Sequence, residues 1–280
     1  MTTGSATHPV LVVIPVYGNI EATRRCLDAL NASDMPDHVS VLLIDDHSPD
    51  DCLSALCRDI ARRDSYELLV NEQNLGFVAS ANRGFEFKGD ADVILLNSDT
   101  VVTGDWISRL QACAYRRDNI GTVTPFTNNG TICSYPVFNA SNPLPDQWAA
   151  AELDGLFATA NEGLFREIPT AVGFCMYIKR ACLEDTGLFD AERFGQGYGE
   201  ECDFCLRASR HGWTHAVAAD VFVFHEGAAS FAGESDERKR AADKVIETIH
   251  PQYHELVEEF LSRDPLREYR DRVDAARLAK

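Results

Sequence analysis

Two continuous apolar runs that end at polar or turn-forming residues constrain the fold most. Val93–Leu96 is followed by Asn97-Ser98-Asp99-Thr100, and Val10–Ile14 is followed by Pro15. Apolar runs of this length are typical of strands buried on both faces, as in a parallel sheet. Short polar residues end strands and begin turns, and open α/β sheets bind ligands at the carboxyl ends of their strands. Asp99 is therefore a candidate ligand for a divalent cation, and the alternative is a turn that caps the next helix.

Strands and helices alternate through the first half of the chain. Further strands are predicted at residues 39–44 and 68–70, and each strand is followed by apolar residues at helical spacing. The helical segments contain Ala22, Cys26, Ala29 and Leu30, then Leu53, Leu56, Ile60 and Ala61, and finally residues 78–87. This alternation predicts an α/β fold with a mostly parallel central sheet, right-handed crossovers and flanking helices.

The pattern changes after Asp99. Helices are predicted at 106–115, 146–165, 200–210, 238–249 and 252–261, and strands at 121–125, 171–179 and 217–224, the last broken by Ala218-Ala219-Asp220. Residues 126–143 are rich in Asn, Pro, Ser and Thr, which predicts a long surface loop. The small residues of 227–235 predict a mobile loop that closes over a bound ligand. A last, weakly packed helix is predicted from Leu266, Tyr269, Val273 and Ala276.

The charge balance limits the partners. A formal net charge of -18 over 280 residues argues against nucleic acid, and against docking on anionic lipid through charge alone. An anionic ligand would need a metal or a local basic patch. No apolar stretch approaches the roughly 20 residues of a membrane span, and residues 1–8 show no secretory signal. The nine scattered cysteines are typical of reduced thiols, so a cytoplasmic location is expected. Peripheral association with the inner face of the membrane stays open, and so does the oligomeric state.

Three predicted strands end in short clusters, namely Pro15-Val16-Tyr17, Asp45-Asp46 and Asn97-Ser98-Asp99. In a parallel sheet these ends lie along one edge, which could hold a nucleotide with Tyr17 near the base and a metal at the diphosphate. Because Asp45 and Asp46 follow a buried strand, both side chains are expected to face the ligand without supporting the core. No glycine-rich phosphate loop follows the first strand.

The order and spacing of these motifs resemble the family 2 glycosyltransferases, whose GT-A fold is Rossmann-like. The similar motifs are Val12-Val13-Ile14-Pro15-Val16-Tyr17, Leu43-Ile44-Asp45-Asp46-His47-Ser48, residues 71–84 with an Asn-x-Gly core, Asn97-Ser98-Asp99-Thr100, residues 199–207, and His225 with Gly227 and Ser230-Phe231. The resemblance covers roughly residues 9–231. It implies a single GT-A domain at 1–262, with a nucleotide-binding half at about 9–105 and an acceptor-binding half at about 106–235, and then a C-terminal helical tail at 263–280.

The resemblance implies an inverting transferase that uses a nucleotide-sugar donor, UDP- or dTDP-linked, and Mn²⁺ or Mg²⁺. Asp46 would contact the base, with Asp45 beside it, and Asp99 matches the metal-binding last position of the DxD motif. Ser98 would lie near the ribose. Asn97 replaces the usual first Asp, so metal binding would rest more heavily on Asp99 and on His225. The remaining candidates for nucleotide binding are Pro15, Val16, Tyr17, Asn74, Gly76 and Asn82.

Glu201 matches the acidic residue that acts as the general base in this family. A base must take the proton from the acceptor hydroxyl as that hydroxyl attacks the anomeric carbon. The family often has Asp at this position, so Glu200 stays open as the alternative, and Asp203 is the next candidate. Acidic residues in the first helical turn also serve as ordinary caps, favoured by the helix dipole.

The expected activity is transfer of a single sugar to a hydroxyl of a glycan or lipid-linked glycan, in polysaccharide biosynthesis. Asn97 keeps open an inactive nucleotide- or carbohydrate-binding GT-A module. A nucleotidyltransferase is disfavoured, because residues 15–19 stand where such enzymes carry a glycine-rich basic loop. Processive synthases carry membrane spans and a Gln-x-x-Arg-Trp motif, and the sequence has neither.

Overall fold

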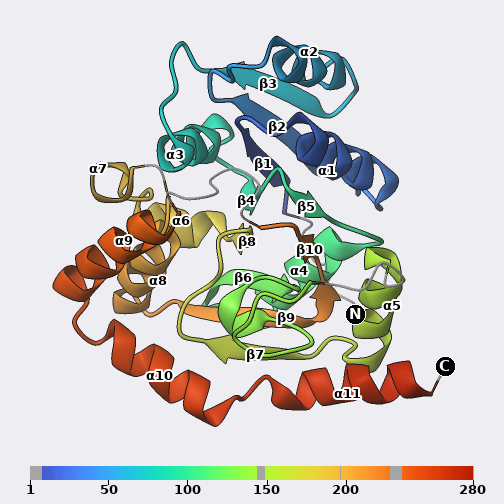
Figure 1. Cartoon of the computed structure of the whole chain (residues 1–280), viewed down its shortest axis with the longest axis vertical. Helices are drawn as coiled ribbons and strands as arrows, with labels where there is room; N and C mark the ends of the chain where they lie inside the picture. The colour runs from blue at the N-terminus through green and yellow to red at the C-terminus, as the bar shows by residue number, and fades with distance from the viewer. Residues whose placement is uncertain (1–7, 144–148, 196, 228–234, 280) are drawn as a thin grey trace, which may run out of the picture.

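The computed structural model describes residues 8–143, 149–195, 197–227 and 235–279. Within these residues the chain forms an eight-stranded sheet in the order β3-β2-β1-β4-β8-β6-β9-β7, flanked by helices (Figure 1). The strands are β1 (Val10–Val16), β2 (Val39–Asp45), β3 (Tyr66–Val70), β4 (Asp92–Leu96), β5 (Thr100–Val101), β6 (Ile120–Phe126), β7 (Phe165–Ile168), β8 (Cys175–Ile178), β9 (Thr214–Phe222) and β10 (Phe224–His225). The helices are α1 (Ile20–Ala32), α2 (Asp51–Ile60), α3 (Phe77–Phe87), α4 (Trp106–Ala114), α5 (Ala150–Ala160), α6 (Arg180–Thr186), α7 (Ala191–Phe194), α8 (Glu200–Arg210), α9 (Ser235–Ile249), α10 (Tyr253–Arg263) and α11 (Arg267–Leu278), with a 3₁₀ turn, η1, at Thr131–Cys133.

The first half of the sheet is parallel, as the sequence predicts. β1 pairs in parallel with β2 on one side and with β4 on the other, and β2 pairs in parallel with β3. The chain therefore reverses its direction of travel across the sheet at β1, which opens a crevice between the ends of β1 and β4. β8 joins antiparallel to both β4 and β6, and β9 pairs parallel with β6 and antiparallel with β7.

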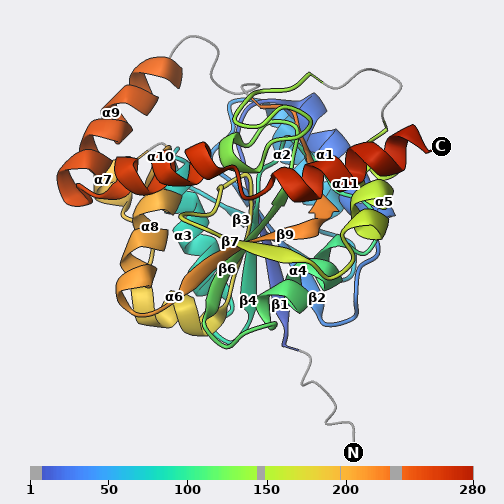
Figure 2. The same ribbon diagram turned by 90° about the horizontal axis from the view of Figure 1, so that it is seen from below.

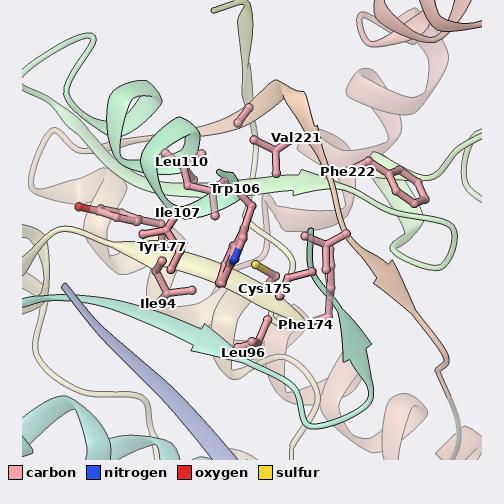
Figure 3. Packing of buried hydrophobic residues seen from close by; sticks show 14 of the residues in the cluster. Ile94, Leu96, Trp106, Ile107, Leu110, Phe174, Cys175, Tyr177, Val221 and Phe222 are labelled. Carbon is pink, nitrogen blue, oxygen red and sulfur yellow. The ribbon is translucent and has the colours of Figure 1, made fainter. Parts of the chain in front are cut away.

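Alternate residues of the strands supply two separate hydrophobic cores. In β1, Val12 and Ile14 face the core beneath α1 and α4, whereas Leu11 and Val13 face the core beneath α3 and α8. Both sets are fully buried, as the continuous apolar run requires for a sheet covered on both faces. Figure 3 shows part of the first core, with Trp106 of α4 directed toward β4 and β8.

Residues 126–143 match the predicted surface loop only in part: Val137, Asn139 and Ser141 are exposed, whereas most of the segment before them is buried. Thr127, Ser134 and Tyr135 are completely buried. The Tyr135 ring packs edge-on against Phe157 of α5, and its hydroxyl donates a 2.8 Å hydrogen bond to Asp274. The segment is held by hydrogen bonds that its polar side chains supply. The polar residues of the buried part therefore form hydrogen bonds within the protein rather than with water.

Two predicted strands also differ from the structure. β9 continues through the predicted break at Ala218, Ala219 and Asp220, but its pairing is irregular there. The register with β7 ends at Ala218, and the register with β6 shifts between Ala218 and Phe222. The Ala219 amide donates to the Leu164 carbonyl, and Asp220 accepts a 2.9 Å hydrogen bond from the Gly163 amide. β8 covers only Cys175–Ile178 rather than the whole of 171–179.

α10 and α11 run along the side of the molecule beyond β7, whereas α9 lies beside α8 (Figures 1 and 2). α11 packs against α5, and Leu266 and Val273 are completely buried, so this helix is not weakly packed as predicted. In the part of the chain that the structure describes, no helix has the length and apolar content needed to span a bilayer. The mobile loop predicted at 227–235 lies largely outside the described residues.

Candidate active site

Strand pairing brings Asp99 and His225 together. β5 and β10 form a two-stranded antiparallel sheet in which His225 lies opposite Thr100. The Asp99 carbonyl accepts a 3.0 Å hydrogen bond from the Glu226 amide, which extends this pairing by one residue. His225 Nε2 consequently lies 3.4 Å from Asp99 Oδ1, and the two side chains are only 14% and 15% exposed.

The orientation of the His225 ring is fixed from behind. Its Nδ1 lies 2.9 Å from the Asn129 carbonyl, which can only accept, so Nδ1 carries a proton. In the neutral ring, Nε2 then directs its lone pair toward the Asp99 carboxylate. Burial alone would lower the pKa of His225, but the hydrogen bond and negative charge of Asp99 outweigh burial and leave the pKa raised. Two electron-rich atoms thus face one another and need a proton or a cation between them.

The side chains present fit a divalent cation that is shared with a substrate. Asn97 Oδ1 is buried without a hydrogen-bond partner in the described structure, and it lines the same pocket as Asp99 and His225. Among the described residues, no group of three or more His, Cys, Asp or Glu side chains could hold a metal by itself. A site with few protein ligands that is completed by phosphate oxygens is the usual arrangement for Mg²⁺.

Asp46 lines the pocket but also supports it. Its Oδ1 accepts hydrogen bonds from Asn71 Nδ2 at 2.6 Å and from the Leu75 amide at 2.8 Å, and its Oδ2 accepts one from the Gly76 amide at 2.9 Å. Asp45 accepts from the Ser48 amide and the Ser54 hydroxyl and does not line the pocket. The expectation that both carboxylates face a ligand without a structural role is therefore corrected, because both hold loops in place.

Asn82 also lies away from the pocket. Its amide donates to the Phe189 carbonyl at 2.8 Å and accepts from the Phe189 amide at 3.0 Å, so the side chain joins α3 to the segment before α7. The Asn-x-Gly core is placed differently, since Asn74 and Gly76 both line the pocket. Gly76 has a φ of 84°, a left-handed conformation that favours glycine.

Glu200 and Glu201 begin α8 and are both part of the pocket wall. The Oε2 atoms of both carboxylates are buried without a hydrogen-bond partner in the described part of the chain. Burial raises the pKa of both groups, and the charge of Glu201 raises the pKa of Glu200 further. Asp203 does not line the pocket and is paired with Arg207 and His250, each at 2.8 Å, so the structure removes it as a candidate base.

One pocket of about 550 Å³ gathers most of the predicted site residues. The predicted residues in its lining are Pro15, Val16, Tyr17, Asp46, Asn74, Gly76, Asn97, Ser98, Asp99, Glu200, Glu201 and His225. Asp45 and Asn82 are the predicted residues outside the lining. The sequence prediction missed Tyr198, Arg238 and Lys239, which also line this pocket. Arg238-Lys239-Arg240 is the longest basic run of this acidic chain, and that run was the signal that could have indicated them.

Solved structures with the same fold contain nucleotides and manganese. GalNAc-T7 with UDP, GalNAc and Mn²⁺ matches 95% of this chain and 55% of its own chain, with a TM-score of 0.62 and 14% identity. The mannosyltransferase PcManGT from Pyrobaculum calidifontis, with GDP-Man and Mn²⁺, matches 98% of this chain and 75% of its own, with a TM-score of 0.62 and 16% identity. At such low identity these likenesses show the fold alone, and that fold is GT-A.

Sequence comparison gives the family. The family model described as "Glycosyltransferase like family 2" matches residues 8–243, and the chain belongs to this family. Glycosyltransferase AglE from Haloferax volcanii is 24% identical over 220 residues, which are 77% of this chain and 66% of AglE. Glycosyltransferase GlyA from Streptococcus pneumoniae serotype 4 is 24% identical over 101 residues, which are 36% of this chain and 14% of GlyA. The matches thus span less than two thirds of these relatives' lengths.

Proposed function

We propose that this protein transfers a single sugar, with inversion, from a UDP- or dTDP-linked donor to a hydroxyl of a glycan or lipid-linked glycan. The observation that carries the proposal is one pocket that combines the Asp99–His225 pair with Glu200 and Glu201, whose Oε2 atoms are buried without a hydrogen-bond partner in the described part of the chain. The first pair suits a cation shared with a diphosphate, and the second suits proton transfer. The two similar structures support the same interpretation, because one contains UDP with Mn²⁺ and the other contains GDP-Man with Mn²⁺.

Each step is assigned to side chains that line the pocket. Asp99 and His225 would hold Mn²⁺ or Mg²⁺, with Asn97 and Ser98 beside them, and a bound metal would offset the charge that develops on the leaving diphosphate. The acceptor oxygen forms a bond to the anomeric carbon from the opposite face as the bond to the diphosphate breaks. Glu201 receives the proton of that hydroxyl, and its raised pKa brings it closer to a base effective at neutral pH.

Asp46 supports the choice of a pyrimidine donor. Its three accepted hydrogen bonds occupy both lone pairs of Oδ1 and one of Oδ2, so one acceptor position is left. Uracil and thymine present a single imide N–H between two carbonyls, which fits one acceptor. Guanine presents two adjacent donors on N1 and N2, which would need both carboxylate oxygens.

Product formation tests the proposal. The chain is first screened for thermal stabilisation by UDP, dTDP and GDP, each with and without Mn²⁺. Nucleotide-sugars of the stabilising base are then incubated with the protein, and release of the nucleoside diphosphate is measured, with Glu201→Gln as the matched control. Release by the wild type, but not by the variant, supports the proposal. Nucleotide binding without release, with every sugar and acceptor tried, would favour the inactive binding module. The cytoplasmic location and the role in polysaccharide biosynthesis stay predictions.

A further inference from the structure

One wall of the pocket takes no part in the mechanism proposed above. It consists of Tyr198, in the segment before α8, and of Arg238 and Lys239 on α9. These two cations are the only Lys or Arg side chains in the described lining of the pocket. The chain has 44 acidic and 26 basic residues, and the same pocket also contains Asp46, Glu200 and Glu201. Two basic side chains in this pocket therefore suggest a binding role.

Lys239 is held by an aromatic ring rather than by a carboxylate. Its Nζ lies 5.2 Å from the centroid of the Tyr198 ring, a cation–π contact. Among residues 8–143, 149–195, 197–227 and 238–279, no carboxylate lies within ion-pair distance of Lys239. In particular, neither Glu200 nor Glu201, which line the same pocket, forms an ion pair with Lys239.

The backbone around Tyr198 is shaped to present its ring. Tyr198 has a φ of 70°, a left-handed conformation that is strained for a bulky residue, between Gly197 at 117° and Gly199 at 87°. Such strain persists only where the surrounding structure imposes it, and it is concentrated at functional sites. Gly199 is also tightly enclosed, because an added Cβ would lie 3.0 Å from the Phe194 ring and 3.3 Å from Ile246 of α9.

The face of α9 that carries Lys239 is anchored beside the start of α8. Lys239, Ala242 and Ile246 are spaced by three and four residues, so they share one face of the helix. Ile246 is buried next to Gly199, and His250, just after the helix, is bonded to Asp203 of α8. Arg240 is exposed, as Lys239 is, but it lies outside the pocket lining.

We propose that Lys239, held over Tyr198 and flanked by Arg238, forms a phosphate-binding subsite that is separate from the Asp99–His225 pair. This inference rests on the proposed function and adds a second, metal-independent contact for a phosphate in the same pocket. Phosphate oxygens are strong acceptors, and hydrogen bonds from an ammonium group to them are charge-assisted. The phosphate can come from the diphosphate of the donor or from a phosphate of a lipid-linked acceptor.

Calorimetry on the full chain in EDTA separates the two sources. UDP and uridine report on the donor, and farnesyl diphosphate, an anionic lipid phosphate, reports on the acceptor. The variants are Lys239→Gln and the matched control Arg240→Gln, which removes the same charge one residue further along α9. Tyr198→Leu and Tyr198→Phe form a second pair, in which only the first removes the ring that holds Lys239.

Lys239→Gln and Tyr198→Leu should each weaken the binding of UDP or of farnesyl diphosphate about 10-fold and leave uridine binding nearly unchanged. Arg240→Gln and Tyr198→Phe should have little effect on the binding of any of these ligands. Weakened UDP binding assigns the subsite to the donor, and weakened farnesyl diphosphate binding with unchanged UDP assigns it to the acceptor. The inference is overturned if neither ligand weakens, or if Arg240→Gln has the same effect. Absence of binding of both UDP and dTDP by the wild type, even with Mn²⁺, would instead defeat the proposed function. In that case, a loss of inorganic pyrophosphate binding in Lys239→Gln alone would still support the subsite, and no difference from Arg240→Gln would defeat it.

Discussion

His225 Nε2 lies 3.4 Å from Asp99 Oδ1 because β10 pairs with β5, the strand that begins directly after Asp99. The pair therefore depends on a contact between two segments that lie far apart in the sequence rather than on one sequence motif. The Asn129 carbonyl fixes the ring by accepting from Nδ1. This leaves Nε2 and the carboxylate to share a cation, and a metal-dependent affinity for nucleotides should follow.

Asp99→Ala should remove most of the Mn²⁺-dependent gain in UDP affinity and leave the affinity measured in EDTA nearly unchanged. The reason is that the carboxylate acts on the nucleotide through the shared cation. Titration calorimetry with Mn²⁺ and with EDTA measures both parts. Asp59→Ala is the control, since the Asp59 side chain is 73% exposed and lies on α2, away from the pocket. Equal wild-type affinities under the two conditions would contradict the proposed cation site.

Asp46→Ala should lose nucleotide binding and also lower the melting temperature. The structure changes the sequence-based expectation of unaltered stability, because the carboxylate accepts from the amides of Leu75 and Gly76 and from Asn71. A buried donor left without its partner costs about 1–3 kcal/mol, and each kcal/mol lowers the melting temperature by roughly 2–4 °C in a chain of 150–250 residues. Differential scanning calorimetry measures the shift. An unchanged melting temperature would show that water replaces the carboxylate without loss.

The strands and their polar ends could be predicted because a doubly covered sheet requires continuous apolar runs, as in Val10–Ile14 and Val93–Leu96. The second half could not be predicted equally well. In residues 126–143, polar side chains bond to the chain itself and bury Tyr135, and composition cannot distinguish such bonding from solvation. The same ambiguity hid the loop-supporting role of Asp46.

Contacts between distant segments were predicted only where the family resemblance supplied them. His225 was predicted to bind the metal from its motif, and strand pairing places it beside Asp99. Lys239 had no motif, and its position depends on how α9 packs against Gly199. A basic run was visible in the sequence, but a basic run is more often a solvated helix face, and only tertiary packing shows that this one lines a pocket.

Two glycines inside helices should respond in opposite ways to alanine. At Gly84 of α3, an added Cβ would lie 2.2 Å from Val13 of β1, whereas at Gly155 of α5 nothing lies within 4 Å. Gly84→Ala should lose about 1–3 kcal/mol through overpacking, and Gly155→Ala should gain roughly 0.5–1 kcal/mol from helix propensity. Urea unfolding measures both free energies. Equal effects of the two substitutions would show that α3 can shift away from β1.

Glu200→Gln and Glu201→Gln should each raise the melting temperature at neutral pH. Burial raises the pKa of both carboxyls above 4.5, so the folded chain holds these protons more tightly than the unfolded chain. Their contribution to stability is full below the unfolded pKa and is lost as the pH rises through the raised folded pKa. The wild type should therefore lose stability relative to both variants across that range, as melting curves recorded at several pH values would show. Parallel curves would mean that the pair is solvated in solution.

The same two variants distinguish the general base. Removal of a base lowers turnover and leaves donor binding intact, and Glu201→Gln should reduce turnover by roughly 10²–10⁴-fold. Glu200→Gln should cost less, because Glu201 and not Glu200 is assigned the role of the base. Turnover and UDP affinity are measured together, so that a loss of binding is not mistaken for a loss of chemistry. If Glu200→Gln is inactive while Glu201→Gln keeps near-normal turnover, the base is Glu200. If both variants stay active, the base lies outside this pair, and Asp203 cannot replace it because Arg207 and His250 hold its carboxylate.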